Sequence, residues 1–242
     1  MFVVGEYWTY DLGTLSWYAT QTGGQMSLFD APLHFNFHRA STAGGNFDMR
    51  TILDGTLMKE MSLLAVTLVE NHDTQPLQAL ESVVEAWFKP LAYAIILLRA
   101  EGYPCIFYPD YYGATYSDFG PDGNQHTVEL PSHRSILDRL LLARRFFAYG
   151  EQRDYFDHPN VIGWTRLGSE HHRRTLAVVL SDGPQGSKWM ETARPHTRYQ
   201  DLTGHCPDAV TTNAEGWGNF GCPGGSVSVW VESAHLPAGF GS

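Results

Sequence analysis

A polar triplet, Asn71-His72-Asp73, lies just beyond the apolar run 63–68. A short buried strand that ends there would bring an imidazole and a carboxylate to the point where a strand meets a loop. The same arrangement occurs near the start of the chain, where residues 2–5 lead into the acid Glu6 and the aromatic Trp8. Carboxylates stabilise developing positive charge and aromatic rings lie against sugar faces, so both clusters suit carbohydrate chemistry.

Strand candidates recur through the first part of the chain and alternate with segments of helical character. The strand candidates lie near residues 2–5, 27–33, 64–70 and 104–108, and the clearest helices are expected over 88–101 and 132–149. This alternation predicts a parallel sheet. Parallel sheets build their sites at the carboxyl ends of the strands, and the acids at or just beyond these four ends are Glu6, Asp30, Asp73 and Asp110. For Asp30 and Asp110, capping of a neighbouring element explains the pattern equally well.

The pattern changes after residue 150 to short alternating segments separated by turns. Strands are expected at 161–166, 175–180 and 226–231, and together they predict an antiparallel β-sandwich over 151–233. The tail 234–242, with Pro237, Gly239 and Gly241, is expected to be poorly ordered. A closed (β/α)₈ barrel takes ~250 residues, so the alternating part, 1–150, supplies about four strands and predicts half of such a barrel.

Charge and composition limit the kinds of molecule that the protein could bind. The net charge of −10 would repel a nucleic acid and suits a neutral substrate or a cation. The longest apolar run, 91–98, is far shorter than the ~20 residues that cross a bilayer, and no secretory leader is visible. Cys105 is expected to be a buried free thiol in a strand, and Cys206 and Cys222 could pair.

Many segments occur in an order that is typical of one enzyme family. They are 4–8, 27–34, 69–76, 87–94, 102–104, 154–158, 163–166, 201–204, 215–218 and 224–229. With them the chain resembles the α-amylase family, glycoside hydrolase family 13, and most of all the liquefying-type bacterial and related fungal α-amylases. The resemblance extends over essentially the whole chain and implies barrel strands five to eight followed by the C-terminal antiparallel β domain.

The resemblance also implies roles for the candidate residues. Glu6 matches the general acid/base after strand five, and Asp73 matches the transition-state stabiliser after strand seven. His72 would contact sugar hydroxyls, and Trp8 would lie on the leaving-group side of the cleaved bond. The parent enzyme would then hydrolyse internal α-1,4 bonds of starch or glycogen with retention, and maltooligosaccharides would be its ligands.

One part of the family pattern has no match. The nucleophilic Asp should precede Glu6, and only five residues do so. We therefore expect an N-terminally truncated fragment that is inactive alone. Two alternatives stay open, a glucan transglycosidase and a non-catalytic α-glucan-binding module. The sequence leaves open the oligomeric state and the location, cytoplasmic or secreted.

Calcium is the cofactor that the resemblance implies, with its main site in the unmatched half. A second calcium in close relatives lies between barrel and β domain. The matching groups would be the backbone oxygens of Gly45, Phe47 and Pro159 and the side chains of Asn160 and Asp182. Asn160 replaces an Asp there, and Asp182 would serve equally well to shape the turn 181–183.

Overall fold

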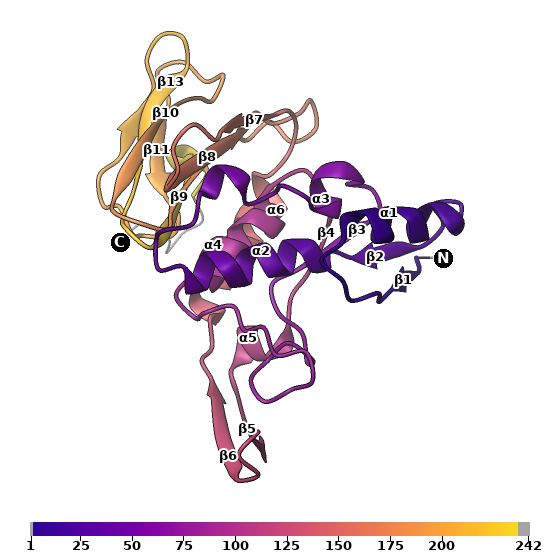
Figure 1. Ribbon diagram of the computed structural model, residues 1–242. Helices are drawn as coiled ribbons and strands as arrows, with labels where there is room; N and C mark the ends of the chain where they lie inside the picture. The colour runs from indigo at the N-terminus through magenta and orange to yellow at the C-terminus, as the bar shows by residue number, and fades with distance from the viewer. Residues whose placement is uncertain (1, 237–242) are drawn as a thin grey trace.

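The computed structural model describes residues 2–236, so the expectation for residues 237–242 lies outside the described part. Four parallel strands open the fold, and they follow one another in the sheet in chain order (Figure 1). They are β1 (Val4–Gly5), β2 (Ser27–Phe29), β3 (Ala65–Leu68) and β4 (Tyr103–Cys105). Each lies within or close to a segment predicted as a strand, and the alternation with helices confirms the α/β part of the predicted fold class.

Helices connect and cover these strands. They are α1 (Leu12–Gln21), α2 (Ala31–Thr42), α3 (Leu57–Glu60), α4 (Lys89–Leu98), α5 (Tyr108–Tyr112) and α6 (Arg134–Phe146), with a 3₁₀ turn, η1, at Met49–Thr51. Helix α4 is buried along nearly its whole length, whereas α6 buries only the stripe of Leu137, Leu140 and Ala143. An all-round apolar helix lies inside the fold and an amphipathic one at its surface, which agrees with the burial of α4 and α6. In the described residues, no helix has the length and apolar character that crossing a bilayer requires.

Two expectations about the strands were wrong. The strand predicted over 27–33 ends at Phe29, because Asp30 caps α2 and Pro32 lies in its first turn. Cys105 is a free thiol but is exposed rather than buried. It lies on β4, the edge strand of the sheet, where the alternate residues Tyr103 and Cys105 are both exposed.

An antiparallel module follows α6. Six strands form one sheet in the order β12-β11-β14-β9-β8-β7, and β10 pairs with β13 in a second sheet. The strands are β7 (Gln152–Tyr155), β8 (Val161–Arg166), β9 (Leu176–Ser181), β10 (Gly186–Glu191), β11 (Arg198–Asp201), β12 (Val210–Thr211), β13 (Trp217–Cys222) and β14 (Ser226–Glu232). A core of Val179, Met190, Phe220 and Trp230 lies between the two sheets, which confirms the predicted β-sandwich. A 3₁₀ turn at Ser233–His235 follows β14.

One hydrophobic core joins the two parts of the chain. The same cluster contains Leu28 of β2, Leu140 of α6, Trp164 of β8 and Val229 of β14. Helix α4 lies against α6, and both contact β14. The hairpin of β5 (Ala114–Phe119) and β6 (Gln125–Leu130), which the sequence did not predict, projects away from this core (Figure 1).

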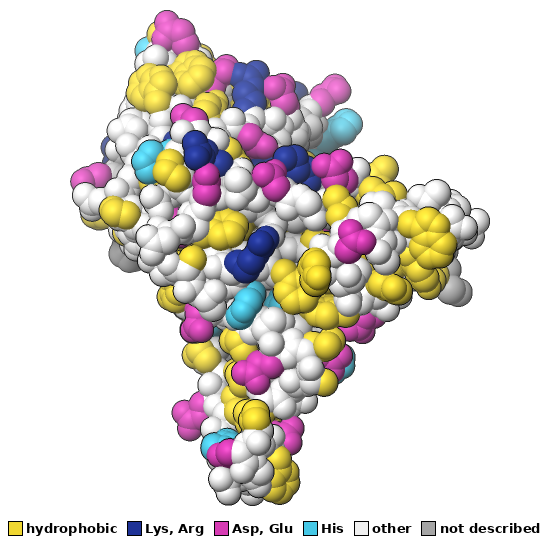
Figure 2. All heavy atoms as spheres, viewed as in Figure 1, with side chains coloured by type: hydrophobic (Ala, Val, Ile, Leu, Met, Phe, Trp, Pro, Cys, Tyr) yellow, Lys and Arg dark blue, Asp and Glu magenta, His cyan; other side chains and the backbone are white. Residues whose placement is uncertain are grey.

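The parallel sheet is strongly curved and only partly covered. The ring of Phe2, just before β1, lies 5.4 Å from the ring of Tyr103 on β4, although two strands separate β1 from β4. Val4 and Tyr103 remain 40% and 48% exposed. Figure 2 shows hydrophobic side chains gathered over the region where Figure 1 places α1 and the first strands. A curved sheet with an uncovered apolar face and two free edges is the geometry expected of half a barrel.

Candidate functional site

Glu6 and Asp73 lie at the same edge of the parallel sheet. Glu6 follows the last residue of β1, and Asp73 stands in the turn that follows β3. Because β2 alone separates β1 from β3, the two strands are about 10 Å apart. Glu6 is exposed, and the side chain of Asp73 keeps 35% of its surface accessible. The arrangement therefore places two accessible carboxylates on one rim of the sheet.

The turn that carries Asp73 is fixed by its own side chains. The Oδ1 atom of Asn71 accepts hydrogen bonds from the backbone N–H groups of Asp73 and Thr74, both at 2.9 Å. Such an Asx turn holds the backbone without help from distant elements. His72 points outward with its side chain 75% exposed, and its Nε2 lies 3.5 Å from Oδ1 of Asp73. His72 and Asp73 are therefore adjacent, as the sequence predicted.

Trp8 is connected to the end of β3 through a buried histidine. Its ring lies 5.3 Å from the ring of His34, a residue of α2 with no exposed surface. Nδ1 of His34 donates to the carbonyl of Val69 at 2.8 Å, so Nε2 accepts from the hydroxyl of Ser82 at 2.8 Å. Burial lowers the pKa of His34 to about 4, and the ring is neutral at neutral pH. His34 thus fixes the loop after β1 relative to the loop after β3.

A buried network of charged groups lies beneath the rim. Lys89 at the start of α4 pairs with Asp110 of α5 and stands 3.6 Å from Oε2 of Glu70, which follows β3. Tyr93 donates to Asp110 at 2.6 Å, and the hydroxyl of Thr74 donates to Glu70. Burial raises the pKa of Glu70 to about 7, although Lys89 opposes the shift. This network holds the Asn71–Thr74 turn against α4 and α5.

Sequence reasoning found only part of this network. Asp110 had two interpretations from the sequence, a site acid at a strand end or a cap of a neighbouring element. In the structure it forms the ion pair with Lys89. Glu70 and Lys89 were not singled out. The available signal was that Lys89, the first residue of α4, is the single charged residue of an otherwise apolar helix, because a charge buried with such a helix requires a partner.

Asp30 has a structural role. It has no exposed surface and accepts hydrogen bonds from the backbone N–H groups of Leu33, Leu57 and Met58 at 3.2, 3.1 and 2.6 Å. Burial raises its pKa to about 6 despite these bonds. The carboxylate joins the first turn of α2 to the first turn of α3, which supports the capping interpretation.

The residues considered for calcium lie together at the junction of the two parts. Asn160 precedes β8, Asp182 follows β9, and Gly45 belongs to the loop after α2. Nδ2 of Asn160 donates to the carbonyl of Gly45 at 2.7 Å and to Oδ1 of Asp182 at 3.0 Å. The carbonyl of Pro159 accepts from the N–H of Met49, and burial raises the pKa of Asp182. In this arrangement the Asn160 amide presents its N–H side to two of the oxygens, which differs from the all-oxygen ligand set that calcium prefers.

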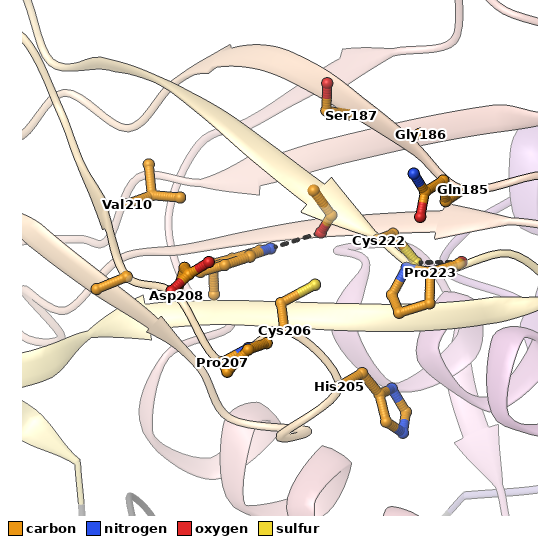
Figure 3. Close-up of a pocket in the computed structure, with 13 residues that line it drawn as sticks. Gln185, Gly186, Ser187, His205, Cys206, Pro207, Asp208, Val210, Cys222 and Pro223 are labelled. Carbon is orange, nitrogen blue, oxygen red and sulfur yellow. Dashed lines mark hydrogen bonds between the residues drawn. The ribbon is translucent and has the colours of Figure 1, made fainter.

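Cys206 and Cys222 line a cavity of about 550 Å³ in the β-sandwich (Figure 3). Both are free thiols. The Sγ atom of Cys206 lies 3.5 Å from the hydroxyl of Ser228, and burial raises the pKa of Cys222 to about 12. The lining of this cavity contains neither Glu6 nor Asp73.

Comparison with known proteins identifies the relationship. The family described as "Alpha-amylase C-terminal" matches residues 176–231. An α-amylase from Geobacillus stearothermophilus is 55% identical over 234 residues, which is 96% of this chain and 41% of that protein. The glucan 1,4-alpha-maltohexaosidase of Bacillus sp. (strain 707) is 50% identical over 96% of this chain and 43% of its own length.

Solved structures agree on the fold. An α-amylase from Geobacillus thermoleovorans, crystallised with acarbose, superposes with a TM-score of 0.66 at 14% identity, over 97% of this chain and 54% of its own.

This chain spans less than half the length of the two curated relatives, and it aligns with them along almost all of its own length. The chain corresponds to the C-terminal portion of proteins of the α-amylase family of glycoside hydrolases.

Proposed function

We propose that this chain supplies the acid/base part of the active site of a retaining α-amylase that cleaves internal α-1,4 bonds of starch-type glucans. The observation that carries the proposal is the placement of Glu6 and Asp73 on one rim of the parallel sheet, with β2 alone between their strands. The connection from Trp8 through His34 to Val69 supports it, because it fixes one loop relative to the other.

The chemistry follows from the positions of these groups. Glu6 donates a proton to the glycosidic oxygen, and Asp73 stabilises the positive charge that develops on the sugar ring. A carboxylate from the complementary half of the barrel serves as nucleophile and forms the covalent glycosyl intermediate. Glu6 then removes a proton from water as the water oxygen attacks the anomeric carbon and displaces the nucleophilic carboxylate, so that the product leaves with retained configuration. His72, which is next to Asp73 and exposed, contacts hydroxyls of the same sugar.

The test joins this chain to the N-terminal half of the Geobacillus stearothermophilus relative and measures release of reducing ends from soluble starch. The 242-residue chain alone is expected to give no hydrolysis, and the joined protein to give it. Glu6→Gln and Asp73→Asn should each lower kcat by at least about 100-fold, because each removes a group that acts in the transition state. Glu60→Gln, which changes an exposed acid on α3, is the matched control. Unchanged turnover in Glu6→Gln would refute the role of Glu6.

A specific observation also favours glucan binding by the β-sandwich. Trp189 of β10 and Trp217 of β13 present two nearly parallel indoles, with ring centroids 6.4 Å apart and an angle of 18° between the planes. Trp189 is 55% exposed. Trp217 is partly buried, so the exposed indole of Trp189 offers the flat surface that suits the apolar face of a glucose chain. By calorimetry, Trp189→Ala should weaken maltoheptaose binding by about tenfold, whereas Trp17→Ala, which removes an indole that is 61% exposed on α1, should not. Equal affinities in both variants would rule this surface out.

A further inference from the structure

We infer that the side-chain amide of Asn160 stands in the place of a cation at the junction of the α/β part and the β-sandwich, and that this junction is held without a metal. Three segments meet there. The loop after α2 brings the carbonyl of Gly45, the residue before β8 is Asn160, and the residue after β9 is Asp182. Two oxygens, the Gly45 carbonyl and Oδ1 of Asp182, converge on the Asn160 amide.

The hydrogen bonds determine which end of the amide faces these oxygens. Nδ2 donates to Gly45 at 2.7 Å and to Asp182 at 3.0 Å. The flipped amide would place its oxygen against a carbonyl and a carboxylate, with no proton between them, and that contact is repulsive. The NH₂ group therefore performs the task that a cation performs among converging oxygens, because it offers each of them a positively polarised hydrogen.

The packing around the amide leaves it little freedom. A Cβ on Gly183 would lie 3.0 Å from Nδ2 of Asn160, and a Cβ on Gly45 would lie 2.9 Å from the carbonyl oxygen of Asp182. Gly45 also has a φ of +85°, which favours glycine. Asp182 is only 4% exposed. The backbones of the loop after α2 and of the turn after β9 therefore lie close together, and the Asn160 amide contacts both.

This arrangement predicts how a single substitution would create a calcium requirement. Asn160→Asp replaces the donor with a carboxylate, so that three oxygen groups would converge with no proton among them. Oδ2 of Asp182, which is buried and has no hydrogen-bond partner in the described structure, would add a further oxygen. Calcium prefers such sets of hard oxygen ligands. The variant should be unstable in chelator and should recover when calcium binds to the folded state.

The experiment compares the 242-residue chain with Asn160→Asp by thermal unfolding in EDTA and in millimolar calcium, and by calorimetric titration with calcium chloride. The wild-type Tm should change by less than about 1 °C between the two conditions, with no saturable heat. The Tm of Asn160→Asp should fall in EDTA and rise by several degrees in calcium, with one site per chain. Asn46→Asp introduces the same charge at an exposed position of the same loop and should show no calcium response.

Two outcomes would overturn the inference. One is a calcium-dependent rise in the wild-type Tm that Asp182→Asn abolishes, because the native junction would then hold a cation. The other is an Asn160→Asp variant that gains no calcium response. If that variant does not fold in EDTA, refolding in calcium decides the matter: recovery supports the inference, and failure in both conditions contradicts it. Asn160→Ala, which only removes the donors, should lower the Tm without any response to calcium.

Discussion

Replacing Lys89 with methionine tests the buried network most directly. Lys89 is 4% exposed and lies between Glu70 and Asp110, which are 3% and 1% exposed. Removing one partner of a buried ion pair leaves an uncompensated charge, which costs about 3–5 kcal/mol of unfolding free energy. Lys59→Met is the matched control, because Lys59 pairs with Asp54 at the surface, where both side chains are about half exposed. That change should cost less than about 1 kcal/mol.

The loss should also depend on pH in a defined direction. The folded-state pKa of Glu70 is raised from 4.5 to about 7, so the folded protein binds more protons than the unfolded chain between these values. The destabilisation from this carboxylate is therefore absent below pH 4.5 and complete above about pH 7. Lys89 lowers the pKa of Glu70, so its removal raises that pKa further. The unfolding free energy of Lys89→Met should therefore keep falling above pH 7, where that of the wild type levels off. The difference between the two slopes should reach up to about 1.4 kcal/mol per pH unit.

Urea unfolding followed by circular dichroism at pH 6 and pH 8 measures both effects. The difference between Lys89→Met and wild type should reach about 3–5 kcal/mol at pH 8 and be at least about 1 kcal/mol smaller at pH 6. Adding Glu70→Gln and Asp110→Asn to the variant should recover part of the loss, because no buried charge then lacks a partner. A loss no larger than that of Lys59→Met, or one that grows towards pH 6, would refute the reasoning.

Two further predictions concern single buried or exposed groups. Asp30→Ala should lower the free energy of unfolding in urea by about 3 kcal/mol or more, because three buried N–H groups lose their acceptor. The control is Asp11→Ala, at the exposed N-cap of α1, which should lower it by about 1 kcal/mol. Equal losses in the two variants would contradict this account. Exposed Cys105 should react first with an aromatic disulfide reagent, whereas buried Cys222 should react only on unfolding, since burial raises its pKa to about 12. A fast phase that survives Cys105→Ser would show that the thiol exposures are wrong.

Local sequence patterns predicted the elements whose signals are short-range. The helix expected over 88–101 forms as Lys89–Leu98, and the one expected over 132–149 forms as Arg134–Phe146. The spacing of their apolar residues and the flanking Pro and Gly residues are sufficient to predict both helices. The strand expected over 27–33 failed at Asp30, because a capping carboxylate followed by proline starts a helix even when apolar residues continue.

Features that depend on distant partners were not predictable. Glu70 is buried because Lys89 and Val84 lie beside it in the fold, and no pattern around residue 70 shows this. The exposure of Cys105 depends on what lies across the sheet from β4, which an apolar strand pattern does not reveal. The positions of Glu6 and Asp73 at one edge of the sheet were predictable, because the carboxyl ends of parallel strands meet at the same edge and only the strand positions are needed.

The shared core restricts how such chains can be recombined. Leu140 of α6, Trp164 of β8 and Val229 of β14 belong to one continuous cluster, so a cut near residue 150 would divide a single packed interior. A chimera that exchanges only the β-sandwich with a relative would bring two unmatched surfaces together and form voids or clashes between them. Exchanges that transfer α4 and α6 together with the sandwich should keep this interior intact.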